Sequence, residues 1–245
     1  MVEGIAERLD AVRRDFTDAL DLGCFDGGFP FPPGLSVARI DAGARFAAIS
    51  GGVQGDEDMP HFPDASFDLV ISAGVLDSVN DLPGALALVR RMLRPDGLFL
   101  GAFLGGSTLS TLRAVMLEAE AERPAARVHP QVDVRAAGDL LVRAGFALPV
   151  ADVETLNVRY ASLFDLVRDL RGMAGTSLLP ASPLSRETVA RAAAAFAARG
   201  DTKGRTTERF DAIFLTGWAP DPSQPKPARR GSATTSLTEA LRPKA

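Results

Sequence analysis

Three acids in the first quarter of the chain follow short apolar runs, and their spacing suits nucleotide binding. Asp21 lies in the run at residues 19–22, directly before a glycine-rich turn. Asp41 ends a second run, at 37–40, about twenty residues later, where a carboxylate can accept both ribose hydroxyls of an adenosine. Asp56 follows a third stretch. Asp41 and Asp56 could instead be helix caps or turn residues, but three acids in this order favour a nucleotide site.

Acids at the ends of apolar runs would lie together if the runs were neighbouring strands of a parallel sheet. In open α/β sheets, ligands bind at the carboxyl ends of the strands. Apolar runs and breaker residues predict strands near 19–22, 37–40, 52–55, 67–72, 98–103, 150–158 and 208–218. The late pair of strands fits a seven-stranded sheet that is mostly parallel, with its last strand antiparallel and helices on both faces. Ser107 or Thr108 is predicted to cap the helix that follows residue 108.

The connection between the first two strands is unusual. Residues 29–34 contain three prolines, which exclude a helix there. Only about nine residues separate the glycine turn from the second strand, whereas a parallel crossover normally needs a dozen or more. The first crossover helix is therefore predicted to be missing.

Composition limits the functional classes. The net charge of −4 argues against binding to nucleic acid, and no apolar run reaches the length of a transmembrane segment, although peripheral membrane contact stays open. The single cysteine, Cys24, excludes an internal disulfide and fits a reducing compartment, so we expect a cytoplasmic location without a secretion signal.

The chain divides into two parts. Residues 1–218 are predicted to form one α/β domain, with a helical insert at about 105–145. Residues 219–245 carry five basic residues against two acidic ones and are rich in Pro and Ser. This composition predicts a disordered or loosely docked tail.

The sequence resembles the class I S-adenosylmethionine-dependent methyltransferases in the Asp-Leu-Gly-Cys motif at 21–24, the acids after the second and third strands, and Phe-Asp-Leu-Val at 67–70. It is more closely similar to one subfamily, the methyltransferase-fold assembly factor of respiratory complex I and its bacterial homologues. That similarity rests on residues 79–83, 93–99, 105–109, 112–113, 143–146, 158–160, 169–173 and 228–234. The mitochondrial member of the subfamily is described as an arginine hydroxylase that acts on a complex I subunit.

The resemblance implies a Rossmann-like methyltransferase fold with S-adenosylmethionine at the carboxyl edge of the sheet. The residues implied near the methionine end are Asp21, Gly23 and Gly27. Those implied near the ribose and the adenine are Asp41, Asp56 and, as second choice, Glu57. Ser72 and Ala73 would line the pocket after the fourth strand.

The chain departs from the family pattern in several places. Phe25 replaces a glycine of the first motif, where a phenyl ring would obstruct a ligand that needs close backbone approach. Asp77 and Ser78 replace a His-Trp pair, and further polar or acidic family positions are occupied by Ser107, Thr111, Ala174 and Gly175.

Two functions follow from these observations. The first is a methyltransferase-family enzyme that methylates or hydroxylates a protein substrate in complex I assembly. The second is a non-catalytic pseudoenzyme that has lost the cofactor and binds an assembly partner, with Phe25, Phe29 or Phe31 filling the pocket.

Few residues are candidates for catalysis. Asp77 and Tyr160 are the candidates on the substrate side, although a solvated loop acid and a core tyrosine are the alternatives. The chain has only two histidines, His61 and His129, which we expect to lie apart in loops, so no metal site is predicted.

Overall fold

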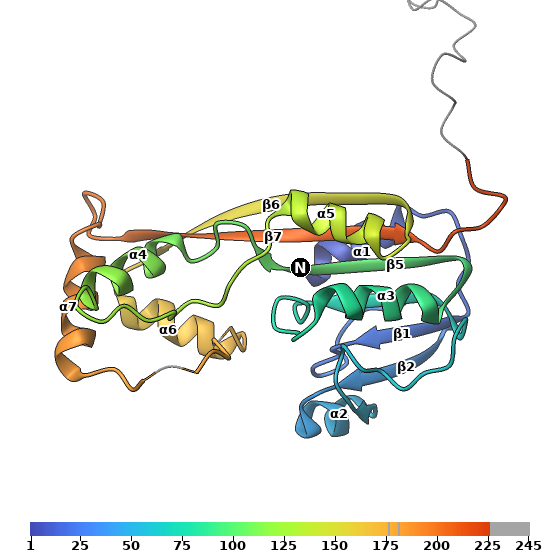
Figure 1. Cartoon of the computed structure of the whole chain (residues 1–245), viewed down its shortest axis with the longest axis horizontal. Helices are drawn as coiled ribbons and strands as arrows, with labels where there is room; N and C mark the ends of the chain where they lie inside the picture. Colours follow the sequence, from blue (N-terminus) through green and yellow to red (C-terminus); the bar gives the residue numbers. More distant parts are fainter. Residues whose placement is uncertain (176, 181, 226–245) are drawn as a thin grey trace, which may run out of the picture.

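A twisted sheet of seven strands runs through the molecule (Figure 1). The computed structural model describes residues 1–175, 177–180 and 182–225. The strands, in spatial order, are β3 (Val53–Gln54), β2 (Ser36–Asp41), β1 (Asp18–Leu22), β4 (Phe67–Ala73), β5 (Leu93–Gly105), β7 (Thr206–Trp218) and β6 (Ala147–Tyr160). Strands β1 to β5 pair in parallel, and β7 runs antiparallel to both neighbours. The predicted seven-stranded, mostly parallel sheet is confirmed.

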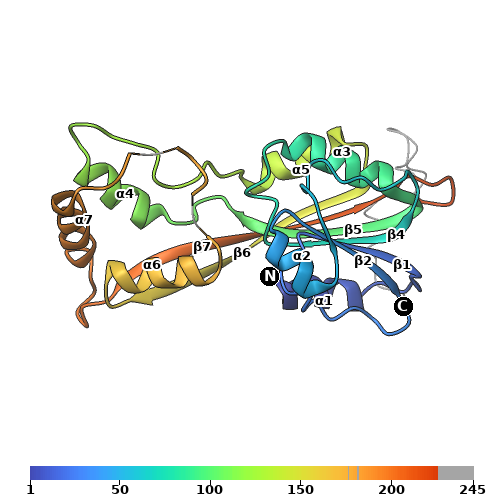
Figure 2. The same cartoon turned by 90° about the horizontal axis from the view of Figure 1, so that it is seen from below.

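Helices cover both faces of the sheet, as Figure 2 shows. On one face, α3 (Leu82–Met92) and α5 (Val134–Arg143) bury Leu86, Val89 and Leu141 against the strands. On the other face lies α1 (Val2–Asp10), which buries Ile5 and Leu9. A short helix, α2 (Ala44–Ser50), follows β2. Burial of these apolar side chains is what holds the layers together.

The crossover from β1 to β2 contains no helix, as predicted, and the structure describes all of its residues, 23–35. Two aromatic side chains of this crossover pack against the sheet on the face where a crossover helix would otherwise lie. The rings of Phe29 and Phe31 contact each other with centroids 4.7 Å apart, and Phe29 is buried in the same cluster as Ile5 of α1. Both rings therefore belong to the core on the α1 face.

A second lobe is built on the far ends of β6 and β7, which extend well beyond the parallel strands (Figures 1 and 2). Helices α4 (Ser110–Ala119), α6 (Leu163–Gly172) and α7 (Arg186–Ala197) pack there around Leu166, Phe196 and Phe210. The segment 105–145, predicted as one helical insert, is divided between the two parts, because α4 joins this lobe while α5 packs into the sheet core.

The cap predicted for α4 is wrong. Leu109 occupies the N-cap position with φ +59° and makes no side-chain cap. The carboxylate of Glu208, on β7, instead accepts the backbone amides of Thr111 and Leu112 over 3.0 and 2.7 Å. A buried acid from a distant strand therefore holds the lobe's first helix to the sheet.

The first residues of the predicted tail pack on the sheet. The amide of Ala219 donates to the carbonyl of Gly97 over 2.7 Å, and Gln224 Nε2 donates to Asp96 Oδ1 over 2.9 Å. The prediction for residues 226–245, including the family-like segment 228–234, lies outside the described residues. Within the described part, no helix combines the length and the apolar character that crossing a membrane requires.

Candidate functional site

Asp21 lies buried near the carboxyl end of β1, beside Arg39 of β2. Its Oδ2 is 3.9 Å from Arg39 Nε, and neither atom has a hydrogen-bond partner among the described residues. Burial raises the pKa of Asp21 to about 6; the Arg39 guanidinium opposes this shift, and the nearby Asp41 and Asp26 add to it. Asp21 is therefore a poorly solvated carboxylate at the edge where a ligand was predicted.

Asp41, predicted to hold a ribose, lies at the end of β2 and contacts its own chain. Its Oδ2 accepts the amide of Phe25 over 2.9 Å, and its Oδ1 accepts the amide of Gly43 over 2.8 Å. The side chain is almost fully buried. Asp41 thus fastens the loop after β1 to the turn after β2.

Phe25 places its ring across the end of β1. Its backbone is left-handed, with φ +47°. The ring packs edge-on against Phe46 of α2 with centroids 5.6 Å apart. On its other side, Phe25 Cε2 lies 3.9 Å from where a Cβ on Gly74, just after β4, would stand. The ring therefore spans from the β2 side to the β4 side of the edge.

The two glycines predicted to cradle the cofactor both have positive φ, +74° for Gly23 and +73° for Gly27. Protein side chains approach them closely. A Cβ on Gly23 would come within 2.3 Å of Val75, and one on Gly27 within 3.2 Å of Arg39 and Ser50. The turn needs glycine because the chain's own side chains pack against it.

The two acids after β3 differ in burial. Asp56, the first choice for the adenine, is exposed, whereas Glu57 is buried and accepts the amide of Ala42 over 3.2 Å. Burial raises the pKa of Glu57. Ser72, in β4, is fully buried with its Oγ unpartnered among the described residues, and Ala73 packs against the core on the α1 face.

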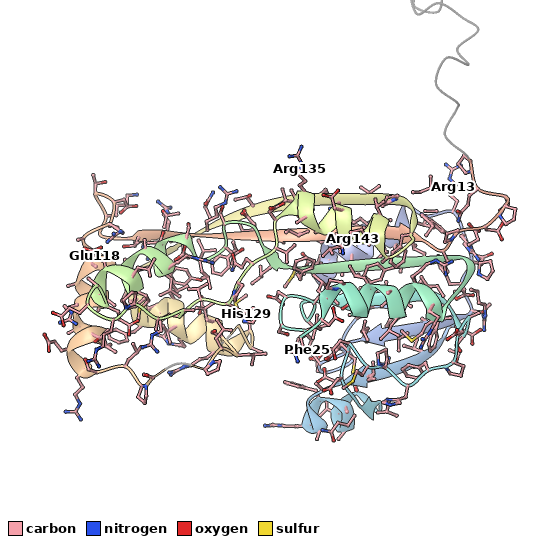
Figure 3. All side chains as sticks on the ribbon, in the orientation of Figure 1. Arg13, Phe25, Glu118, His129, Arg135 and Arg143 are labelled. Atoms are coloured by element: carbon pink, nitrogen blue, oxygen red, sulfur yellow. The ribbon has the colours of Figure 1, made fainter. Side chains whose placement is uncertain are left out.

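A cavity of about 450 Å³ lies between this edge and the helical lobe. From the sheet side, Phe25, Gly74, Val75 and Asp77 line it. From the lobe side it is lined mainly by apolar residues of α4, α6 and the loops beside them: Leu109, Leu112, Val128, Val167, Leu170, Met173 and Leu178. None of the residues predicted to bind the cofactor lines this cavity. Figure 3 shows Phe25 and His129 on the two sides of the region where lobe and sheet meet.

Of the two catalytic candidates, Asp77 lines the cavity and Tyr160 does not. Asp77 is half-buried, and burial raises the pKa of its carboxyl to about 6. Tyr160 is buried in the core of the lobe, where burial and a hydrogen bond with Asp169 raise its pKa to about 12. Tyr160 therefore lies in the packed core of the lobe and away from the cavity wall.

Sequence reasoning missed two polar residues of the cavity wall. His129 Nδ1 and Gln131 Oε1 are buried and lack hydrogen-bond partners among the described residues. His129 had been expected only as a loop residue, and Gln131 carried no motif. No group of three or more His, Cys, Asp or Glu in the described part of the chain is arranged to hold a metal ion.

The fold implies S-adenosylmethionine as a ligand, but the residues present do not fit it. The half-buried Phe25 ring lies at the end of β1 against Phe46, and Val75, Arg39 and Ser50 pack close to the glycine turn. Each oxygen of Asp41 already accepts a backbone amide. The space beside Asp41 is therefore lined by the chain's own side chains, although an ionised carboxylate that accepts two amides still has lone pairs for further donors.

The order β3-β2-β1-β4-β5-β7-β6, with an antiparallel β7 and acids at the carboxyl edge, defines a class I methyltransferase fold. Residues 20–101 match the family described as "Methyltransferase domain". The chain belongs to the family of the arginine hydroxylase NDUFAF5. It is 33% identical to the mitochondrial protein of that name from Danio rerio over 252 residues, covering 96% of this chain and 78% of the relative. The predicted family is confirmed.

Solved structures support the fold alone, because their sequence identities are low. The YcgJ protein of Bacillus subtilis superposes with a TM-score of 0.65 at 14% identity, covering 90% of this chain and all (100%) of that one. Phosphoethanolamine N-methyltransferase 2 of Haemonchus contortus, solved with S-adenosyl-L-methionine, gives a TM-score of 0.53 at 17% identity, covering 90% of this chain and 52% of that one.

Proposed function

We propose that this chain acts in respiratory complex I assembly by binding an arginine-bearing segment of a protein partner in the cavity between the sheet and the helical lobe. The observation that carries the proposal is Asp77. Among the described residues that line the cavity it is the only carboxylate, and burial raises its pKa to about 6. The family name, arginine hydroxylase, supports arginine as the group recognised.

A guanidinium suits this cavity on physical grounds. It presents five N–H donors in a planar fork and can bond a carboxylate with two of them. Asp77 would accept such a pair. His129 Nδ1 and Gln131 Oε1, buried atoms of residues that also line the cavity, have no partners among the described residues. The apolar residues of α4 and α6 would pack along the methylene stem of the arginine. A bound guanidinium would offset part of the free energy that it costs to bury the ionised carboxylate of Asp77.

Two modes of action remain distinct. In the first, the chain modifies its partner, either by methylation with S-adenosylmethionine, the cofactor suggested by the family, as the methyl donor, or by arginine hydroxylation, which would need molecular oxygen and a reductant as further co-reactants. In the second, it binds its partner without chemistry. The contacts of Phe25 and Asp41 favour the second mode. The single cysteine supports a reducing compartment such as the cytoplasm in either mode.

Peptide binding tests the recognition step. Overlapping peptides that tile the complex I subunits would be titrated into the full chain by fluorescence anisotropy, each paired with a copy in which citrulline replaces arginine. We expect binding that needs arginine and that Asp77→Asn weakens by at least about tenfold. Asp139→Asn, an exposed carboxylate of α5 outside the cavity, is the matched control and should bind as the unaltered chain does.

Equal binding of arginine and citrulline peptides, or full binding by Asp77→Asn, would overturn the proposal. Mass spectrometry of a captured partner separates the two modes. An added methylene or oxygen on arginine marks an enzyme, and an unmodified partner marks a binding protein.

A further inference from the structure

The chain carries its own aromatic group where open α/β sheets receive a ligand. In such sheets the ligand crevice opens where the strand order reverses. Here the chain runs outward from β1 to β3 and then returns to β4 on the other side, so the reversal lies between β1 and β4. Gly74 follows β4 at this point, and Phe25 follows β1.

The Phe25 ring lies near both sides of that crevice, in contact with Phe46 of α2 and close to the backbone of Gly74 after β4. Phe46 lies 5.6 Å away, between ring centroids, on the side of β2. The position of a Cβ on Gly74 lies 3.9 Å from the ring on the side of β4. A flat aromatic group that spans the crevice in this way takes the space that a nucleoside would need.

The backbone of the same residue is also fixed. The amide of Phe25 donates to Asp41 Oδ2 over 2.9 Å. An ionised carboxylate has about four lone-pair sites, so this bond leaves Asp41 able to accept further donors. The obstacle to a ribose is therefore the ring of Phe25 and not a shortage of acceptors.

We propose that Phe25 takes the place of a nucleoside in this chain, closing a latent adenosine site that the rest of the carboxyl edge still retains. Removing this one side chain would open the site. The change suits the backbone, because Phe25 has φ +47°, a conformation that glycine adopts without strain. Phe25→Gly should therefore fold even though it loses the contact with Phe46.

Calorimetric titration with S-adenosylhomocysteine tests the proposal on the full chain. We expect one-site binding by Phe25→Gly that is tighter than any binding by the unaltered protein by at least about tenfold. Asp41→Ala in the Phe25→Gly background should remove that gain. Phe62→Ala is the control, because it also loses an edge-on aromatic contact, with Phe67, but lies outside the crevice.

Two results would overturn the proposal. One is binding of S-adenosylhomocysteine by the unaltered chain as tight as that of Phe25→Gly. The other is the absence of binding by a Phe25→Gly protein whose circular dichroism and cooperative unfolding match the unaltered chain. Should Phe25→Gly unfold, Phe25→Ala gives the same comparison. The measurement is independent of the peptide titration, so failure of one leaves the other standing.

Discussion

Arg39 Nε and Asp21 Oδ2 lie 3.9 Å apart in the sheet interior, too far for a hydrogen bond, and both are buried without another partner among the described residues. The attraction of opposite charges offsets only part of the cost of removing Asp21 from water, and its pKa rises to about 6. The carboxyl edge therefore retains a destabilising charge that the chain itself does not need for the fold. Such uncompensated groups are typical of ligand sites.

Asp21→Asn is predicted to stabilise the protein at neutral pH. Because the native pKa of about 6 exceeds the ordinary 3.8, the native state binds more protons between these values. The free energy of unfolding then falls as pH rises through this window and stays low above it. Asparagine does not titrate, so the free energy of unfolding of Asp21→Asn should exceed that of the unaltered chain by about 1–3 kcal/mol at neutral pH. This difference should vanish near pH 4.

Urea unfolding at about pH 4, 5.5 and 7.5 measures this dependence. Asp139→Asn, an exposed acid of α5 away from this edge, serves as control and should change little at any pH. A gain for Asp21→Asn that is equal at all three pH values would contradict the explanation, because it would not come from the titration of Asp21.

Local sequence patterns were sufficient to predict the parallel part of the sheet. Apolar runs with acids identified β1, β2 and β3, a further apolar run identified β4, and the prolines at 30–33 excluded the first crossover helix. These features depend on neighbours in the sequence. The lobe could not be predicted in the same way, because its core joins Val115, Leu166 and Phe196, which only the fold brings together.

At the candidate site, too, some features could be predicted from sequence neighbours and others depend on the fold. Phe25 was identified as an obstacle because it replaces a glycine, and the structure does place its ring in the crevice. That Asp41 would accept the amides of Phe25 and Gly43 could not be foreseen, because an acid after a strand carries the same signal whether it binds a ligand or its own chain. His129 Nδ1 and Gln131 Oε1 lack partners in the described part of the chain, and their positions depend on the path of a loop without regular structure.

Glu208→Ala is predicted to destabilise the protein by about 2–4 kcal/mol, because it leaves a cavity and two helix amides of α4 without acceptors. Glu208 is fully buried, and its two oxygens accept the amides of Thr111 and Leu112. Glu208→Gln keeps one acceptor and should cost about half as much. Chemical denaturation measures the loss.

Hydrogen exchange locates the effect of this change. The amides of Thr111 and Leu112 should lose protection in Glu208→Ala before the rest of the lobe does. Glu118→Ala is the control, because Glu118 on α4 forms only an exposed ion pair with Arg199, which should contribute less than about 1 kcal/mol. Unchanged protection at those two amides would show that Glu208 does not act as the cap.

Asp211→Asn is predicted to loosen the junction between the sheet and the lobe. Asp211, on β7, is buried and accepts Thr155 Oγ1 and Arg209 Nε over 2.7 Å each, and the amide of Ser107 over 2.8 Å. Burial alone would raise its pKa, but these hydrogen bonds outweigh burial and lower it. An amide cannot accept at both positions, so we expect a loss of about 2–4 kcal/mol.

The pH dependence of Asp211→Asn has the opposite sign to that of Asp21→Asn. The native pKa of Asp211 is lowered, so its carboxylate stabilises the folded protein at pH values above the ordinary carboxyl pKa. This stabilisation is lost as the pH falls through the native pKa. The difference between Asp211→Asn and the unaltered chain should therefore shrink in acid. A difference that stays constant from neutral pH into acid would show that lost packing, and not charge, causes the effect.

Binding of an arginine peptide is predicted to depend on pH through Asp77. In the free protein burial raises the pKa of Asp77 to about 6, and a guanidinium binds the ionised carboxylate. Affinity should therefore be constant well above pH 6 and fall by up to about tenfold per pH unit below it. Anisotropy titrations from about pH 5 to 8 measure this profile.

The other charged groups on the cavity wall require their own controls. Arg127, Arg171 and His129 also line the cavity. Arg127 donates two hydrogen bonds to the carboxylate of Glu120. His129→Gln removes the imidazole from the wall and should leave the fall below pH 6 in place. Asp77→Asn should bind weakly with a flat profile. If His129→Gln flattens the profile while Asp77→Asn retains it, then His129, and not Asp77, controls recognition of the guanidinium.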